Sequence, residues 1–244
     1  QPEPLFQIAR KGLNLIGAGL IASSVVTQGI TDMHHPLNPR TDDQRLKRPP
    51  TFWTNRLTSP LRALPDFLII GEMKSGTSSL FHYLTRHPLV VPPIRKEIHF
   101  FTEGYSRGLA WYRAHFPLKR HLPAGAVTGE GCPGYLFAPE ADKRICEVLP
   151  DARLIVILRN PTDRAISHYY HEVKMGREYL QLKDALQIEE ERLSGLNMDD
   201  PEGRETYLHA SYKLRGRYAD SLARFFDVFG REQILILGNN ELLK

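Results

Sequence analysis

One short stretch, GEMKSGTSS at residues 71–79, combines a cation, two glycines and several hydroxyls. Lys74 supplies a full positive charge, and Gly76 allows the backbone to come close to a ligand. The hydroxyl donors beside them are Ser75, Thr77, Ser78 and Ser79. Side chains of these types in one loop are suited to binding a phosphate or a sulfate group.

The residues on either side predict a strand before this loop and a helix after it. Residues 67–70 are apolar and branched, as in a buried strand of a parallel sheet. Leu80, Phe81 and Leu84 recur at helical spacing. The loop therefore leads into a helix N-terminus, where unpaired backbone N–H groups and the helix dipole favour an anion.

The order of the loop residues separates this chain from nucleoside-triphosphate-binding enzymes. In those enzymes the lysine directly follows the last glycine and precedes Ser or Thr. Here Lys74 comes before Gly76, so that pattern is not met. By itself the loop is typical of many α/β proteins as well as of a phosphosulfate site.

A carboxylate and an imidazole lie close together in RKEIHFF at residues 95–101. If this segment is extended, Glu97 and His99 share one face. Near an anion-binding loop, such a pair can remove the proton from an acceptor hydroxyl. The alternative is a charged strand end whose phenylalanines pack inward, and the periodicity does not separate the two.

A second candidate anion site follows residues 154–158, an apolar run typical of a central parallel strand. Arg159 stands at the carboxyl end of this run, and Asn160 and Pro161 are suited to begin a helix. Ser167 lies on an early turn of that helix, so Arg159 and Ser167 are candidates to bind one anion. The alternative is a structural arginine paired with a carboxylate. The strand does not end in the acidic residue with which P-loop enzymes help to hold magnesium.

Apolar runs and helical patterns alternate along the rest of the chain. Further strands are expected at residues 89–91, from residue 127, and at residues 233–237. Helices are expected from Pro139, around residues 182–193 and over residues 218–229, with a surface loop at residues 199–203. We therefore predict an α/β fold, a three-layer sandwich around a mostly parallel sheet.

Composition limits the functional classes. A chain of 244 residues with 41% hydrophobic residues fits one α/β domain with a tail. The net charge of +4 is too small to imply a general nucleic-acid-binding surface. Cys132 and Cys146 are too few for a disulfide framework or a metal cage, so we expect buried free thiols.

The first 64 residues are expected to form a tail and a connector. Residues 12–31 carry no charge and have about the length needed to cross a bilayer. Their many polar residues and glycines make this a weak candidate for a membrane span and favour a surface-packed or loosely ordered segment. Residues 33–64 are rich in proline and in basic residues, which predicts an extended connector.

Four blocks occur in order along the chain: PDFLIIGEMKSGT (65–77), KEIHFF (96–101), GLAWYRAHFP (108–117) and LRNPTDRAISHY (158–169). Together they resemble the family of sulfotransferases that use 3′-phosphoadenosine 5′-phosphosulfate (PAPS), in particular its heparan-sulfate-type and related bacterial carbohydrate branch. The resemblance covers residues 65–244, which we expect to form one sulfotransferase domain with a P-loop-like phosphosulfate-binding loop.

The resemblance implies a role for each residue singled out above. Arg159 and Ser167 would hold the 3′-phosphate of PAPS. Glu97 would be the general base, with His99 in a supporting role, and Lys74 would also steady the charge on the bridging oxygen. No metal is implied. The residues implied to hold the 5′-phosphosulfate are Lys74, Ser75, Gly76, Thr77, Ser78 and Ser79.

Two features depart from the family pattern. Gly131 stands where heparan-type enzymes commonly have a lysine, which weighs against a heparan acceptor. The sequence also ends before the lysine-glycine loop that in the family closes over the nucleotide, so we expect part of the donor pocket to be missing.

The predicted function is transfer of a sulfuryl group from PAPS to a hydroxyl acceptor. A carbohydrate is favoured, because Arg95, Lys96 and the basic residues 119–121 suit a polyanionic glycan, while a lipid, a small alcohol or a protein tyrosine stays open. No nucleic-acid partner is expected. The alternatives are a P-loop nucleotide kinase and a non-catalytic nucleotide-binding relative. We expect a cytoplasmic location, with a membrane-anchored enzyme in the Golgi lumen as the alternative, because residues 12–31 are a weak candidate for a membrane span.

Overall fold

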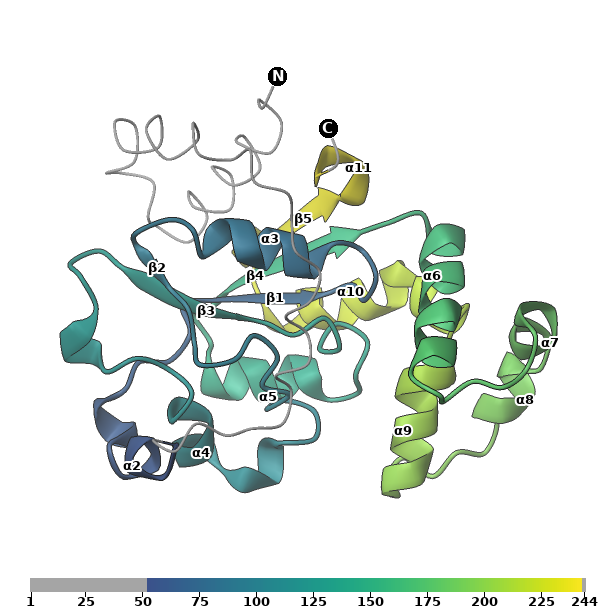
Figure 1. Cartoon of the computed structure of the whole chain (residues 1–244), viewed down its shortest axis with the longest axis horizontal. Coiled ribbons are helices and arrows are strands. Elements are labelled where there is room, and N and C mark those ends of the chain that lie inside the picture. The colour runs from purple at the N-terminus through teal and green to yellow at the C-terminus, as the bar shows by residue number, and fades with distance from the viewer. Residues whose placement is uncertain (1–51, 243–244) are drawn as a thin grey trace.

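Five parallel strands form the centre of the computed structural model, which describes residues 52–242 (Figure 1). They lie in the order β2-β3-β1-β4-β5. Their bounds are Phe67–Gly71 for β1, Val90–Val91 for β2, Val127–Gly131 for β3, Arg153–Leu158 for β4 and Ile234–Gly238 for β5. All neighbouring pairs are parallel, so the carboxyl ends of the strands meet at one edge of the sheet.

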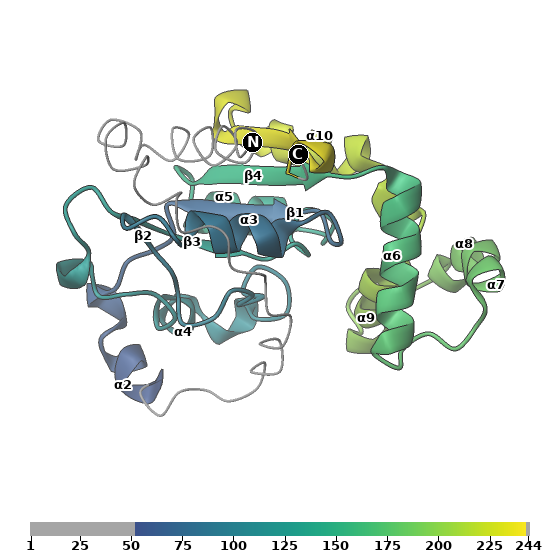
Figure 2. The same ribbon diagram turned by 45° about the horizontal axis from the view of Figure 1, so that its top comes forward.

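Helices cover both faces of this sheet, and Figure 2 shows them in front of the strands and behind them. Alternate side chains of β1 point to opposite faces, with Ile69 in one core cluster and Leu68 in the other. The Ile69 face packs against α3 (Thr77–Leu84). The opposite face packs against α5 (Ala141–Val148) and α10 (Tyr218–Val228). The predicted three-layer α/β fold is confirmed.

Aromatic side chains pack around α4 (Leu109–Arg113), in the core cluster on the Leu68 face of the sheet. The rings of Phe100 and Tyr112 stack at a centroid distance of 4.3 Å, and Trp111 lies beside them. Packing is therefore the role of the aromatic residues in this block. The short 3-10 turns η4 (Tyr105–Arg107) and η5 (Lys119–His121) flank α4.

The prediction of an extended connector over residues 33–64 is wrong for residues 52–61. These residues form α2 (Phe52–Leu57) and the 3-10 turn η3 (Ser59–Leu61). Phe52 is 2% exposed within the aromatic cluster. Arg62 donates to the side chain of Asn55 and to the carbonyl of Phe116. The contact with Phe116 joins residues 54 positions apart, so local composition could not reveal it. The remaining connector and residues 12–31 lie outside the described residues.

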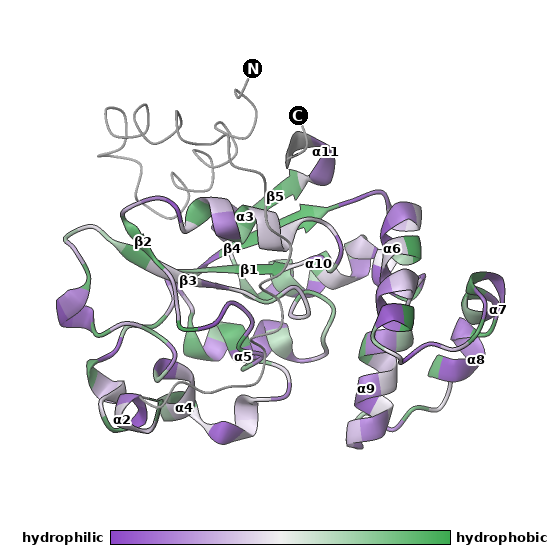
Figure 3. Cartoon of the chain, viewed as in Figure 1, coloured by the Kyte–Doolittle hydropathy of each residue, from purple (hydrophilic) through white to green (hydrophobic). Residues whose placement is uncertain are grey.

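A group of helices extends from the end of β4, at the right of Figure 1. It contains α6 (Pro161–Lys174), α7 (Leu182–Gln187), α8 (Glu189–Leu193), α9 (Pro201–Ala210) and the 3-10 turn η6 (Leu214–Gly216). Hydrophilic residues alternate with hydrophobic ones along these helices, whereas the strands are mostly hydrophobic (Figure 3). Their small core consists of Ala165, Tyr169, Ala185 and Tyr212.

Two details of this group differ from the sequence-based expectations. The single helix expected around residues 182–193 is interrupted at Ile188. The surface loop expected at residues 199–203 is shorter, because α9 begins at Pro201. Asp200 caps this helix by accepting a hydrogen bond from the Gly203 N–H at 3.1 Å.

Cys132 and Cys146 are free, as predicted, although only Cys132 is fully buried. Within residues 52–242, no helix is both long enough and hydrophobic enough to cross a membrane. The chain closes with the 3-10 turn η7 (Arg231–Gln233) before β5 and the short α11 (Asn239–Leu242) after it.

Candidate active site

The loop between β1 and α3 turns sharply through two residues in the left-handed region. Lys74 has φ 68° and Gly76 has φ 103°. The Glu72 N–H donates to the Ile157 carbonyl of β4 at 2.8 Å, which fixes the start of the loop against the neighbouring strand. Residues other than glycine rarely adopt the backbone conformation of Lys74, and such backbone geometry is concentrated at functional sites.

The loop offers polar groups that suit an oxyanion. Thr77 begins the eight-residue helix α3, whose first N–H groups face the loop. Ser75 is buried, and its Oγ has no hydrogen-bond partner among the described residues. Ser78 and Ser79 are exposed on the first turn of the helix. These hydrogen-bond donors therefore fit the phosphosulfate group that the family resemblance implies here.

The second predicted corner, after β4, lies directly beside this loop. Arg159 Nη1 donates to the Lys74 carbonyl at 3.3 Å. Tyr218 in turn donates its hydroxyl to the Arg159 carbonyl at 2.8 Å. Asn160 caps α6 by accepting from the Thr162 N–H at 3.0 Å, as its position before Pro161 predicts. Because β1 and β4 are parallel neighbours, their carboxyl ends bring the two corners together.

Ser167 is less directly placed. It is half-buried on α6, in the turn that also carries the buried His168. Within residues 52–242, no hydrogen bond joins Ser167 to Arg159. Shared binding of one anion by these two residues stays a prediction.

Glu97 lies next to the anion loop through its neighbour Lys96. The Lys96 ammonium donates to Ser78 Oγ at 3.0 Å and to Glu97 Oε1 at 2.8 Å. The other carboxylate oxygen, Oε2, lies 3.6 Å from His99 Nε2. The segment is an irregular loop rather than an extended strand, and His99 has φ 59°. Glu97 and His99 nevertheless converge, because the loop turns one side chain back toward the other.

Charged neighbours decide the protonation of this pair. Burial alone would raise the pKa of Glu97, but His99 and the Lys96 ammonium outweigh it and lower that pKa to about 2. The pKa of His99 is raised, first by its contact with Cys132 and also by the Glu97 carboxylate. Burial raises the pKa of the Cys132 thiol itself. Near neutral pH the thiol is therefore uncharged, and Glu97 is the partner that favours a protonated His99.

Sequence analysis missed Glu130, a residue of β3 that holds the Glu97 loop by a hydrogen bond to its backbone. Glu130 is 0% exposed on β3. Its carboxylate accepts hydrogen bonds from the Ile98 N–H and from the hydroxyls of Tyr112 and Tyr135, each at 2.8 Å. Burial raises the pKa of Glu130, although these donors act in the opposite direction. A lone acid inside an otherwise buried strand was the available sequence signal.

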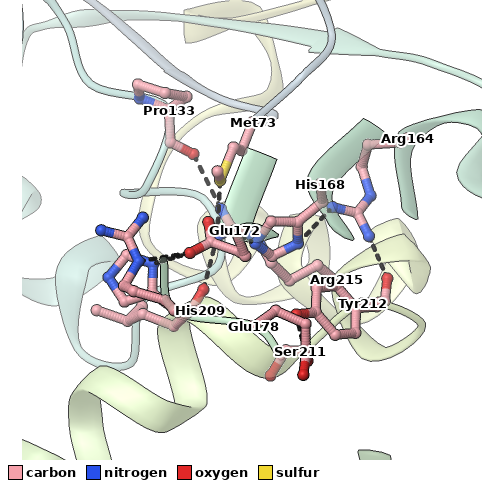
Figure 4. Close-up of polar contacts among 12 residues, drawn as sticks. Met73, Pro133, Arg164, His168, Glu172, Glu178, His209, Ser211, Tyr212 and Arg215 are labelled. Carbon is pink, nitrogen blue, oxygen red and sulfur yellow. Dashed lines mark hydrogen bonds and ion pairs between the residues drawn. The ribbon is translucent and has the colours of Figure 1, made fainter. Parts of the chain in front are cut away.

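Arg215 is the second residue that sequence analysis missed (Figure 4). Its guanidinium forms an ion pair with Glu72 in the anion loop, with Nη2 at 2.7 Å from Oε1. It also donates to the Pro133 carbonyl at 3.4 Å and to the Leu208 carbonyl at 3.2 Å. Arg215 and Glu72 are both buried. Arg215 therefore joins the helical group to the loop, and no local pattern could link residues 143 positions apart.

The basic residues 119–121 lie away from this site. They form η5, which precedes the amino end of β3, whereas the anion loop follows the carboxyl end of β1. Figure 1 shows the two at opposite edges of the sheet. The structure therefore does not place this cluster beside Glu97, whereas the exposed Arg95 is next to Lys96 in the same loop.

The fold is that of an α/β protein, and its candidate anion loop lies at the carboxyl ends of the strands of a parallel sheet. The model of the family described as the sulfotransferase domain matches residues 64–244. The chain therefore belongs to the sulfotransferase domain family, and the resemblance drawn from the four sequence blocks is confirmed.

Individual relatives agree with this assignment. Human heparan sulfate glucosamine 3-O-sulfotransferase 6 is 46% identical over 108 residues, which cover 44% of this chain and 30% of the relative. Membrane-associated sulfotransferase kil1 of Dictyostelium discoideum is 38% identical over 114 residues, 47% of this chain and 24% of the relative. Bifunctional heparan sulfate N-deacetylase/N-sulfotransferase 1 of Caenorhabditis elegans is 28% identical over 91% of this chain but 25% of its own length. The matches thus span less than a third of these curated relatives.

A solved structure is similar over a larger share of its own chain. The crystal structure of a sulfotransferase from Alicyclobacillus acidocaldarius has a TM-score of 0.60 and 33% sequence identity. The match covers 74% of this chain and 75% of that one. The fold is therefore shared with a sulfotransferase.

Proposed function

We propose that this protein transfers a sulfuryl group from PAPS to a hydroxyl group of a carbohydrate. One observation carries the proposal. The Arg159 guanidinium donates to the Lys74 carbonyl at 3.3 Å, so two separate strand-to-helix corners lie side by side. Two adjacent cationic corners suit a ligand with anionic groups at two positions, as PAPS has. Membership of the sulfotransferase domain family supports the same donor.

Each corner has its own share of the donor in this proposal. Residues 74–79 hold the 5′-phosphosulfate through the α3 N-terminus, the Lys74 ammonium and the serine and threonine hydroxyls. Arg159 and Ser167 hold the 3′-phosphate. Asn239, which follows β5, donates to the Ser75 carbonyl at 2.6 Å and keeps the loop in place.

The reaction needs one proton acceptor and one site for developing negative charge. The acceptor oxygen forms a bond to sulfur while the bond from sulfur to the 5′-phosphate oxygen breaks, which leaves 3′-phosphoadenosine 5′-phosphate (PAP). Glu97 takes the hydroxyl proton, and His99, 3.6 Å from it, holds the carboxylate in place. Lys74 stabilises the charge that develops on the departing oxygen.

The relatives support the choice of acceptor and leave the location to experiment. Two of the relatives have heparan sulfate in their names, and a carbohydrate acceptor follows by analogy. Arg95 and Lys96 beside Glu97 suit an anionic sugar. One relative is named as membrane-associated, which supports the membrane-anchored alternative over the cytoplasmic one.

Binding of PAP without magnesium tests the donor site. We expect isothermal titration calorimetry in EDTA to show binding by the full chain, and Lys74→Ala and Arg159→Ala to weaken it by at least about tenfold each, because each removes a cation from a charge-assisted contact. The matched control is Lys119→Ala, which removes a cation from the opposite edge of the sheet and should leave the affinity unchanged.

The result also separates the alternatives. Magnesium-dependent binding of ATP with similar affinity, together with no PAP binding in EDTA, would favour a P-loop nucleotide kinase. Tight PAP binding with no transfer of labelled sulfate to any of a panel of glycans would favour a non-catalytic nucleotide-binding relative. Transfer to one glycan class would identify the acceptor.

A further inference from the structure

Two neighbouring cationic side chains hold Glu97, the residue that is proposed to act as the base. The Lys96 ammonium lies 2.8 Å from Oε1, and the His99 ring lies 3.6 Å from Oε2. The two cationic partners lower the pKa of Glu97 to about 2, against the opposing effect of burial. A general base works best with a pKa near the working pH. Held in this way, Glu97 is a weak base.

Lys96 is also in contact with the loop that is proposed to bind the donor. Its ammonium donates to Ser78 Oγ at 3.0 Å, and Ser78 lies on the first turn of α3. One flexible cation therefore touches the proposed base and the proposed donor site at the same time. An oxyanion that binds at Ser78 competes with Glu97 for this cation, because charge attraction grows as the separation falls.

Gly131 provides the space in which the Lys96 side chain lies. A Cβ atom built on Gly131 would lie 3.2 Å from Lys96 Cε and 3.2 Å from a ring carbon of Phe81. The Gly131 N–H also donates to the Lys96 carbonyl at 3.3 Å. Any side chain at this position would press on the lysine, so the glycine allows Lys96 to reach both partners.

We propose that Lys96 is a donor-responsive positioning residue, which holds Glu97 until the phosphosulfate draws the ammonium toward α3 and thereby releases Glu97 to accept the acceptor's proton. This inference rests on the proposed function. It makes the base effective only when the donor is in place. The lysine moves by rotation about its own flexible stem, so the main chain around residues 96–99 keeps its contacts with Glu130.

Carboxyl ¹³C NMR of the full chain, titrated with acid in the presence and absence of PAP, tests this inference. Loss of one signal in Glu97→Gln identifies the Glu97 carboxyl. We expect PAP to raise the pKa of Glu97 by at least about one unit, a tenfold change in its proton affinity. In Lys96→Met the pKa should already be raised without PAP, and PAP should raise it by less than half as much as in the unchanged chain.

Two further variants keep the test decisive. Arg95→Met removes an exposed cation from the neighbouring position and should leave the response of Glu97 to PAP intact. Gly131→Ala, which retains the lysine but crowds its stem, should raise the pKa of Glu97 without PAP while PAP binding persists. If Lys96→Met does not fold, Gly131→Ala carries the test.

Failure of this inference can be told apart from failure of the proposed function. If calorimetry shows that PAP binds but the pKa of Glu97 does not move, or moves equally in Lys96→Met, Lys96 is not the responsive residue. If PAP does not bind the unchanged chain, the proposed donor is wrong, and the inference that depends on it is overturned as well.

Discussion

Two carboxylates lie beside Ile98 and are held in opposite ways: Glu97 precedes it in the chain, and Glu130 accepts a hydrogen bond from its N–H. Glu97 has a side chain that is 29% exposed and is held by the charged groups of Lys96 and His99. Glu130 is fully buried and is held by neutral donors, two tyrosine hydroxyls and a backbone N–H. The pKa of Glu97 is lowered, whereas burial raises that of Glu130.

The difference shows how a site separates reaction from support. Charged partners on flexible side chains can be redistributed when a ligand arrives, so they suit a group that must change its proton affinity. Neutral donors that are buried in the core, such as Tyr112 on α4 and Tyr135 in the turn after β3, cannot move without breaking the core, so they suit a group that fixes a loop. We therefore expect removal of Glu97 to affect turnover and removal of Glu130 to affect stability.

The largest effect should follow Glu97→Gln. This change keeps the shape of the side chain but removes the proton acceptor, so we expect turnover of labelled sulfate to fall by about two to four orders of magnitude. PAP affinity should change little, and the free energy of unfolding in urea should fall by only about 1 kcal/mol, because the ion pairs are partly exposed.

The control for this change is Glu191→Gln, which neutralises an exposed acid on α8, away from the Glu97 loop, and should leave turnover unchanged. Unchanged turnover in Glu97→Gln would assign Glu97 to the supporting class with Glu130 and remove the contrast between them.

The next effect should follow Glu130→Ala, measured as the free energy of unfolding in urea. The change leaves three buried donors without an acceptor, and we expect a loss of about 3 kcal/mol or more. Tyr112→Phe removes one donor while keeping the ring stacked on Phe100, and it should lose about 1 kcal/mol. Equal losses in both variants would mean that the bond from the Tyr112 hydroxyl accounts for the whole stabilising effect of the Glu130 carboxylate, and that its bonds to Ile98 and Tyr135 add nothing.

The smallest effect should be a dependence of stability on acid. Because the folded chain lowers the pKa of Glu97 from 4.5 to about 2, its ion pairs stabilise the fold above about pH 4.5, and the gain is lost as the pH falls toward 2. The difference in unfolding free energy between the unchanged chain and Glu97→Gln should therefore shrink by about 1 kcal/mol between pH 6 and pH 3. A constant difference would show that charge does not hold Glu97.

Much of the sheet and of the anion loop could be predicted from local sequence. The apolar runs at residues 67–70 and 154–158 define the central strands, because only strands buried on both faces lack polar alternation. Asn160 before Pro161 correctly predicts the start of α6. Parallel strands then bring Lys74 and Arg159 to one edge of the sheet, so their proximity follows from topology.

The rest depends on contacts that the sequence does not display. The irregular path of residues 95–101 includes a left-handed His99, and periodicity carries no information about such a backbone. Glu130 and Arg215 each bond to partners far along the chain. Even so, an acid within VTGEG, where a buried strand is expected, is an unusual feature and marks a buried polar contact.

The ion pair between Glu72 and Arg215 has a consequence for synthesis of the protein. A ribosome makes the first strand and its loop early, but the guanidinium that neutralises the Glu72 carboxylate is added 143 residues later. Until then the acid has no partner and favours contact with water over burial. We therefore expect the loop between β1 and α3 to be among the last parts of the nascent chain to reach its native conformation.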